Sequence, residues 1–431
     1  MTTETIQEHQ RIPYNSDELQ CVWKEGMRLP PQREGLDRWF FQWQWIKPCQ
    51  CNDSEEDTTD NDGSYGYYAS YVIGAQWLDK EKKSMPLVVT PKDGCESIDF
   101  LSMFSTCFKS GISAEDFSRI YGVDLDQPRI RAPQLKSVLS PLLVAHFLTV
   151  IEKIIRRGLK KDYVEIENNL RKVRGRIDIA RNEQKNIIPK RYDRITCKHQ
   201  EYSVNTPENR LLKKALLFSR QILYSTAISR SLEPLQQTVN QFLAFFHGID
   251  DQIEVWEVSE IKHHKIFREY KEAVRLAQMI LQRYDYSIAR VGVSGEYTPV
   301  FWLDMSLLYE HYVYGLLKDA YGDKIQYQKC GYTGYPDFIC YDPIIVMDTK
   351  YIPRFDKSNV DTYIARQLSA YSRDRRLFND EPKENIPCLI IFPKVGEALN
   401  PFKKKSLFDL LTEEDKHLWQ FYRIAVPLPS L

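Results

Sequence analysis

The stretch Tyr335–Tyr351 constrains this chain most strongly. It reads Y-P-D-F-I-C-Y-D-P-I-I-V-M-D-T-K-Y, two apolar runs around a turn signal at 342–343, which is typical of a β-hairpin. A two-residue turn there places Asp337 opposite Asp348, with Cβ atoms about 5 Å apart. Lys350 lies two residues beyond Asp348 and therefore points to the same face. The sequence thus predicts that two carboxylates and one ammonium group meet on one face of a short sheet.

Two carboxylates this close together are unfavourable unless a cation lies between them, and the cation could be Lys350, a divalent metal ion, or both. Pro343 is disfavoured as the second residue of a tight hairpin turn, which leaves a register shifted by one residue as an alternative. That shift would send one carboxylate to the other face of the sheet. A surface hairpin with an ordinary ion pair is the alternative without function, because an isolated D-x-K recurs by chance.

The pattern P-D…D-x-K resembles the signature of the PD-(D/E)xK nucleases. Carboxylate oxygens suit Mg²⁺, which keeps several waters and binds phosphate oxygens, so Asp337 and Asp348 favour Mg²⁺ or Mn²⁺ over Zn²⁺. Such an ion lowers the pKa of a bound water and stabilises the charge on a displaced phosphodiester oxygen. Lys350 would orient or activate that water.

The segments around the hairpin carry further candidates. Glu310 lies on the apolar stripe of a helix expected at 303–317, where a half-buried carboxylate needs a partner. It is either an additional acid of the metal site, as the preceding helix often supplies in these nucleases, or a boundary residue capped by an arginine. After the hairpin, Gln367 and Tyr371 share one face of a helix and match an auxiliary Q-x-x-x-Y motif. An apolar strand at 387–393 completes an expected α-β-β-α-β order.

Length and composition set outer limits. A chain of 431 residues is expected to form two or three domains, and its zero formal net charge argues against a globally basic nucleic-acid binder. Its nine cysteines include no C-x-x-C pair, which favours reduced thiols in a cytoplasm. No apolar run approaches about 18 residues, and the first residues lack the apolar core of a signal peptide. We therefore expect a cytoplasmic protein without a membrane span.

We expect an α+β multidomain fold in three parts. Residues 1–130 are predicted to form a β-rich N-terminal domain, with aromatic residues at 39–45 in a strand. An acidic run at 52–63 is interpreted as a solvated loop, with metal or a basic partner as the alternative. Residues 131–290 are predicted to form a mainly helical middle region. Residues 291–431 are predicted to form a PD-(D/E)xK restriction-endonuclease-like α/β domain that folds without the first 130 residues.

The middle region shows clear helix signals. Apolar spacing predicts a helix over 135–154, and basic residues at 156–161 suit its C-terminal dipole or, alternatively, a phosphate. His146 on its apolar face is interpreted as a core residue rather than a ligand. Thr206 is a typical N-cap before Pro207 at the first position of another helix. Four cysteines could ligate zinc, but their spacing fits no common zinc frame, so no zinc site is expected there: Cys49, Cys51, Cys95 and Cys107.

Several blocks, in order, resemble the McrC family, the nuclease subunit of McrBC-type restriction systems directed at 5-methylcytosine. The resemblance implies that Asp337, Asp348 and Lys350 are catalytic and that Asp337 and Asp348 bind the metal. Glu310 is implied less directly, because the family does not always keep an acid there. The blocks are Val173–Ile179, Ser203–Lys213, Asp304–Tyr309, the hairpin, Gln367–Tyr371 and Leu389–Pro393.

The resemblance also implies partners. They are a ring-shaped McrB-like AAA+ GTPase, which in the family docks onto the N-terminal region, and double-stranded modified DNA, with dimerisation as a possible route to double-strand cleavage. In residues 1–130 the resemblance is confined chiefly to Val88–Lys92. The chain has no G-x-x-x-x-G-K-[ST], so GTP would be bound only through the partner. The alternatives are a stand-alone bacterial or archaeal nuclease in repair or defence, and a non-catalytic NTPase activator.

Overall fold

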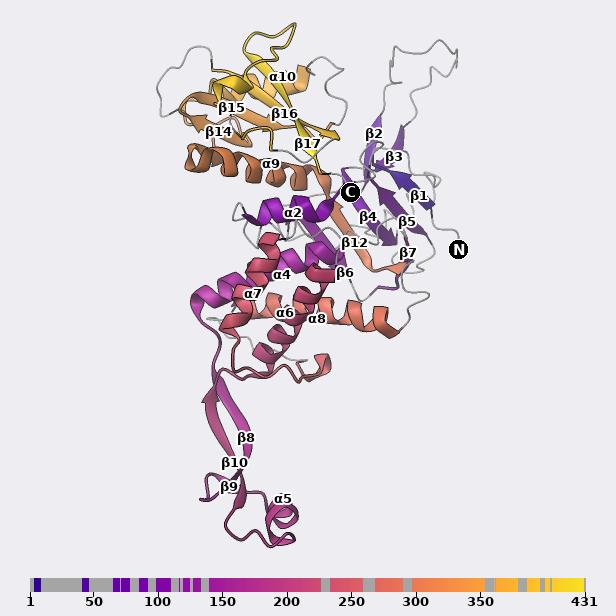
Figure 1. Cartoon of the computed structure of the whole chain (residues 1–431). Helices are drawn as coiled ribbons and strands as arrows, with labels where there is room; N and C mark the ends of the chain where they lie inside the picture. Colours follow the sequence, from indigo (N-terminus) through magenta and orange to yellow (C-terminus); the bar gives the residue numbers. More distant parts are fainter. Residues whose placement is uncertain are drawn as a thin grey trace. The chain divides into compact units, whose positions relative to one another are not determined.

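The chain is a mixed α and β protein with several sheets (Figure 1). Its computed structural model forms two compact units, one combining Met1–Leu142 with Arg290–Leu431 and the other comprising Leu143–Ala289. The structure describes residues 4–8, 41–45, 65–69, 71–77, 85–91, 98–109, 116, 119–124, 127–132, 139–225, 233–258, 268–289, 297–352, 360, 362–378, 386–395, 400–403 and 405–429.

The first unit contains a five-stranded sheet in the order β1-β5-β4-β12-β6. Its apolar strands β4 and β5 are buried, β4 along its whole length. The strands are β1 (Glu4–Gln7), β4 (Val72–Trp77), β5 (Pro86–Thr90), β6 (Tyr121–Asp124) and β12 (Val300–Asp304). Two small sheets accompany it: β2 (Phe41–Trp45) with β3 (Tyr65–Ala69), and β7 (Ile130–Arg131) with β11 (Tyr297–Thr298).

Strand β12 corrects the predicted boundary at residue 291. It follows that boundary in sequence, yet it lies between β4 and β6 and pairs with both in antiparallel register. Helix α2 (Phe100–Lys109) packs against α9 (Met305–Tyr321) so closely that a Cβ at Gly315 would lie 2.6 Å from the Thr106 carbonyl oxygen. Removing residues 1–130 would strip both partners from β12, so independent folding of residues 291–431 is not expected.

The second sheet of this unit has the order β13-β14-β15-β16-β17. Its β14–β15 hairpin pairs Tyr341 with Ile344, the predicted register, which excludes the one-residue shift. Helix α9 precedes the hairpin and α10 (Thr362–Tyr371) follows it, as predicted, whereas β13 and β17 extend the sheet beyond the prediction. The strands are β13 (Ile325–Tyr327), β14 (Phe338–Tyr341), β15 (Ile344–Thr349), β16 (Cys388–Val395) and β17 (Phe421–Leu428), with short 3₁₀ turns η6 (Gly322–Lys324) and η8 (Phe408–Leu410).

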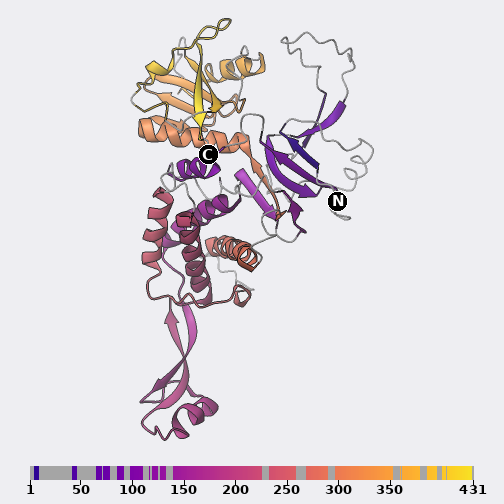
Figure 2. The ribbon, with the colours of Figure 1, turned by 45° about the vertical axis from the view of Figure 1, so that its right-hand side comes forward.

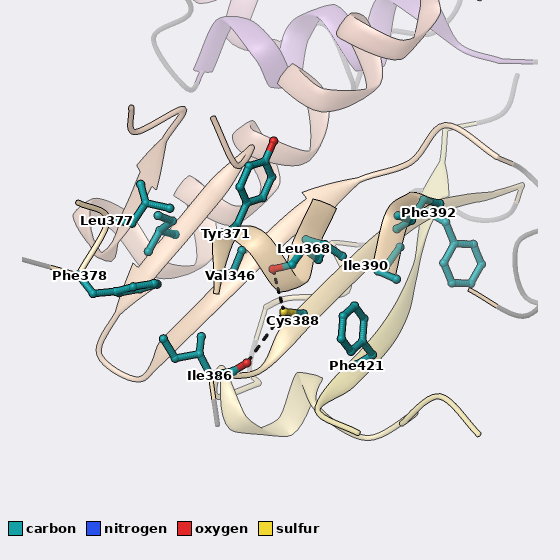
Figure 3. Close-up of a cluster of buried hydrophobic side chains, with 12 residues drawn as sticks. Val346, Leu368, Tyr371, Leu377, Phe378, Ile386, Cys388, Ile390, Phe392 and Phe421 are labelled. Atoms are coloured by element: carbon teal, nitrogen blue, oxygen red, sulfur yellow. Dashed lines mark hydrogen bonds between the residues drawn. The ribbon is translucent and has the colours of Figure 1, made fainter. Parts of the chain in front are cut away.

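Helix α10 covers one face of this sheet. Figure 3 shows Leu368 and Tyr371 of α10 packed with Val346 of β15 and Ile390 of β16 in one buried cluster. Because side chains alternate along a strand, Asp348 emerges on the same face as Val346. The apolar packing of α10 therefore holds its polar residues over the end of β15.

The second unit contains α4 (Leu139–Arg157) from Leu143 onward, α6 (Pro207–Ser225), α7 (Glu233–Phe245) and α8 (Arg268–Ala289), with a 3₁₀ turn at Val255–Glu257. The N-cap prediction for α6 is confirmed, since the backbone N–H of Asn209 donates to Thr206 Oγ1 at 3.3 Å. His146 is buried with its Nε2 3.4 Å from a Glu272 carboxylate oxygen, in agreement with a core position.

The prediction of a mainly helical middle region missed a three-stranded sheet. Strands β8 (Asp162–Leu170), β10 (Ile195–Ser203) and β9 (Arg176–Ile177) pair in the order β8-β10-β9. In Figures 1 and 2 this hairpin extends away from the helices of its unit and ends in α5 (Ile179–Asn182), which continues into a π-helical turn at Glu183–Ile187. The sequence of this segment has little helical spacing, so its backbone N–H and C=O groups find their hydrogen-bond partners between strands instead of within a helix.

Several sequence predictions fall outside the described residues. These are the acidic run at 52–63 and three of the four cysteines considered above as zinc ligands, whereas Cys107 is a buried free thiol. No helix in the part of the chain that the structure describes is both long and apolar enough to span a membrane.

Candidate active site

The hairpin register brings the predicted acids together. Asp337 directly precedes β14, Asp348 lies near the end of β15, and the pairing of Phe338 with Met347 places these two ends side by side. Lys350 follows β15, and its backbone N–H donates to the Ile391 carbonyl oxygen of β16 at 2.9 Å. The backbone pairing of three strands therefore positions both carboxylates and the lysine.

Asp348 and Lys350 form a buried ion pair. Asp348 is only 2% exposed, and the Lys350 ammonium contacts its Oδ2. Burial raises the pKa of Asp348, and the neighbouring ammonium offsets only part of that rise. Burial also acts to lower the pKa of Lys350, but the Asp348 carboxylate outweighs it, so the pKa of Lys350 is raised. Lys350 therefore stays protonated at neutral pH.

Asp337 has a different set of partners. Its Oδ2 accepts hydrogen bonds from the backbone N–H of Thr349 at 2.6 Å and from Thr349 Oγ1 at 2.5 Å. Among the residues that the structure describes, no cation lies within ion-pair distance of this half-buried carboxylate. Burial, together with the carboxylates of Asp348 and Glu310, raises the pKa of Asp337 well above its ordinary value. The predicted repulsion between the two carboxylates is thus offset by Lys350 at Asp348. At Asp337 it is offset only in part, by the two hydrogen bonds from Thr349.

Gln328 connects Glu310 to Asp337. Its side-chain amide donates to Glu310 Oε1 at 2.7 Å, and its backbone N–H donates to the Asp337 carbonyl oxygen at 3.0 Å. Its φ is +44°, in the left-handed region that non-glycine residues seldom adopt. Sequence reasoning missed Gln328 and Thr349, because nothing in the local sequence signals a contact made through the fold.

The auxiliary pair completes a chain of polar contacts. Lys350 Nζ donates to Gln367 Oε1 at 3.2 Å, and Gln367 Nε2 donates to Tyr371 Oη at 3.0 Å. Gln367 and Tyr371 share a face of α10, as their spacing predicts. The structure therefore brings together the six residues predicted from the sequence for the nuclease site: Glu310, Asp337, Asp348, Lys350, Gln367 and Tyr371.

The donor set suits one kind of metal ion. Among the described residues, no three His, Cys, Asp or Glu side chains converge into a ready-made metal site. Mg²⁺ does not require one, since it keeps several waters and is commonly bound through one or two carboxylates. Burial raises the pKa of both acids, and the carboxylates of Asp348 and Glu310 add to the rise at Asp337, so a divalent cation would stabilise their ionised forms. The residues present therefore fit Mg²⁺.

The comparisons with solved structures give distant likenesses. One is a refined half-complex from a tetradecameric assembly of Thermococcus gammatolerans McrB AAA+ hexamers with bound McrC. It is 16% identical, with coverage of 100% of this chain and 95% of that chain and a TM-score of 0.36. The other is the Thermococcus gammatolerans McrBC complex, 14% identical, with coverage of 73% and 87% and a TM-score of 0.29. These scores are too low to carry an argument, and no curated protein sequence matches the chain.

A protein-family model also matches the chain. The match runs over residues 125–376, more than half of the chain, and it includes the hairpin and α10. The family is described as McrBC 5-methylcytosine restriction system component, and this chain belongs to it.

Proposed function

We propose that this chain is the metal-dependent DNA endonuclease subunit of a GTP-driven, modification-dependent restriction complex. The observation that carries the proposal is the convergence of Asp337, Asp348 and Lys350 at the end of one hairpin. The surrounding order α9-β14-β15-α10-β16 is the order expected of a PD-(D/E)xK nuclease domain. Membership of a restriction-system family supports DNA as the substrate.

Each side chain has a distinct role in phosphodiester hydrolysis. Asp337 and Asp348 would hold Mg²⁺ or Mn²⁺, with Glu310 as a further acid held by Gln328. When bound, the ion supplies stabilisation of negative charge on the phosphate and an acidified water. Lys350 presents a fixed positive charge beside the reacting phosphate, where charge develops in the transition state. Gln367 and Tyr371 restrain the Lys350 side chain through their hydrogen bonds.

The first test is cutting itself. The full chain, with an McrB-like GTPase, GTP, Mg²⁺ and a duplex carrying 5-methylcytosine, is expected to produce double-strand breaks on a gel. An excess of chelator is expected to abolish the breaks, and added Mg²⁺ to restore them, because the proposed reaction needs the ion to acidify the attacking water, which Lys350 alone does not do. Full activity in excess chelator would reject the metal-dependent assignment.

We propose that GTP is bound by a separate partner chain. The sequence contains no P-loop, and the family is one component of a restriction system. The docking role predicted for residues 1–130 remains a prediction. A second surface also suits a protein partner, because the segment between β9 and β10 exposes Ile179 at 76%, Ile188 at 68% and Tyr192 at 76%. Apolar side chains gathered on an exposed segment commonly mark an interaction site.

We expect Ile179→Asp with Ile188→Asp to weaken assembly with the GTPase at least about tenfold, since the loss of an interface hot spot costs about 2 kcal/mol or more. Co-elution and GTP hydrolysis would be measured on the same preparation. Trp256→Asp is the matched control, a 75%-exposed apolar residue of the same unit outside the hairpin. Unchanged assembly of the double variant would favour the N-terminal region as the docking site.

A further inference from the structure

The loop of residues 330–336 leads directly into Asp337 and has a fixed conformation. Asp374, only 4% exposed, accepts hydrogen bonds from the Thr333 backbone N–H at 2.7 Å and from Thr333 Oγ1 at 2.8 Å. Its other oxygen accepts from the Arg376 backbone N–H at 2.9 Å. Burial acts to raise the pKa of Asp374, but these donors outweigh it and lower the pKa. One buried carboxylate therefore clamps the loop to the turn after α10.

Two glycines let the loop approach this clamp and the catalytic cluster. A Cβ at Gly331 would lie 2.5 Å from Asp374 Oδ2. Gly334 adopts φ +135°, and a Cβ there would lie 3.2 Å from the Tyr371 ring. Because Tyr371 hydrogen-bonds Gln367, which holds Lys350, the loop lies directly beside the proposed active site.

The loop presents aromatic rings and a cation to solvent. Tyr332 is 77% exposed and Tyr335 is 58% exposed. The Arg376 guanidinium lies 5.7 Å from the centre of the Tyr332 ring, and Arg375 beside it is also exposed. Within residues 330–336 and 371–378, Asp374 is the sole acid, and it is buried. This surface is therefore locally basic on a chain whose formal net charge is zero.

We infer that Tyr332, Tyr335 and Arg376 form a binding surface for the DNA strand next to the scissile phosphate. Arginine contacts phosphate oxygens with its planar fork, and an exposed aromatic ring stacks an unpaired base without regard to sequence. The clamp keeps these groups ordered before DNA arrives, so little conformational entropy is lost on binding. The inference rests on the proposed nuclease function, and it identifies this loop as the contact that orients the strand.

The test measures binding without cutting. The full chain is titrated into a fluorescent 5-methylcytosine duplex with a short unpaired end, in chelator, at several salt concentrations. Arg376→Ala is expected to weaken binding about tenfold and to reduce the salt slope by about one, as loss of one phosphate contact does. Tyr332→Ala is expected to weaken binding about tenfold with an unchanged salt slope, and Tyr332→Phe to bind like wild type.

Lys416→Ala is the matched control. Lys416 is exposed and precedes β17, whose parallel pairing with β16 places that segment at the opposite end of the sheet from Asp348. It should bind within about twofold of wild type, in the range of surface substitutions outside an interface. The inference would be overturned if Tyr332→Ala and Arg376→Ala both bound DNA like wild type, or if Lys416→Ala weakened binding as much as they do. It would also be overturned if the wild-type chain did not bind DNA. The nuclease assignment is judged separately, by DNA cutting with and without chelator, so its failure can be told apart from a failure of this inference.

Discussion

Lys350→Ala is expected to lower the rate of DNA cutting by about 10²–10³-fold, as the loss of one charge-stabilising group commonly does. Lys350 is the one described cation paired with Asp348, and Gln367 restrains it over the hairpin end. Alanine removes the charge that would face the phosphate, while both carboxylates remain. Cutting of methylated duplex and GTP hydrolysis by the partner would be measured on one preparation. Assembly and GTPase stimulation should stay near wild type.

The substitution also affects stability, and a second variant separates the two effects. Leaving the Asp348 carboxylate buried without its cation is expected to destabilise the chain by up to about 3–5 kcal/mol, less if Asp348 takes up a proton. Lys350→Ala with Asp348→Asn removes the orphaned charge, so it should regain stability in urea but not cutting. Lys324→Ala, which breaks only an exposed pair with Asp342, is the control expected to change neither. Wild-type cutting by Lys350→Ala would show that the site is misassigned.

Asp337→Asn is expected to abolish cutting and yet to stabilise the metal-free chain at neutral pH, by about 0.5–2 kcal/mol. The Asn carbonyl oxygen still accepts from Thr349, while the ionised carboxylate near Asp348 and Glu310 is gone. Mg²⁺ at a hundredfold excess over its dissociation constant should stabilise the wild type by about 2.7 kcal/mol and the variant by much less. Urea unfolding with and without Mg²⁺ provides the measurement.

The pH dependence follows from the direction of the pKa shift. The pKa of Asp337 is raised in the folded chain, so its contribution to stability is fully present below the unfolded-state pKa, near about 4. That contribution is lost as pH rises through the folded-state pKa. Asparagine does not titrate, so the stability advantage of Asp337→Asn should grow as pH is raised above about 4.

Asp374→Asn is the control, because the pKa of Asp374 is shifted in the opposite direction to that of Asp337 and the stability change should have the opposite sign. The pKa of Asp374 is lowered by its hydrogen bonds, so it stabilises the fold above its unfolded-state pKa and loses that contribution as pH falls. Its amide variant should therefore be less stable than wild type at neutral pH, by about 1–3 kcal/mol. If Asp337→Asn proved less stable than wild type without metal at pH 7, the excess negative charge inferred at the site would be contradicted.

The sequence by itself determined the local features of the candidate site. Alternating side chains and a turn at 342–343 predicted the hairpin register that the structure shows. Helical spacing placed Gln367 and Tyr371 on one face, and Thr206 marked the start of α6. These features depend on residues close together in the chain, where backbone geometry limits the choices to a few.

Only the tertiary structure decided which distant residues support the site. Gln328 reaches Glu310, Thr349 donates to Asp337, and Asp374 clamps a loop that begins more than forty residues earlier. Likewise, β12 joins β4 and β6 although more than 170 residues separate it from β6. Such contacts form where packing brings distant segments together, and the hydrogen-bonding needs of buried polar groups then select their partners. No short sequence pattern records that choice, because it depends on the whole fold.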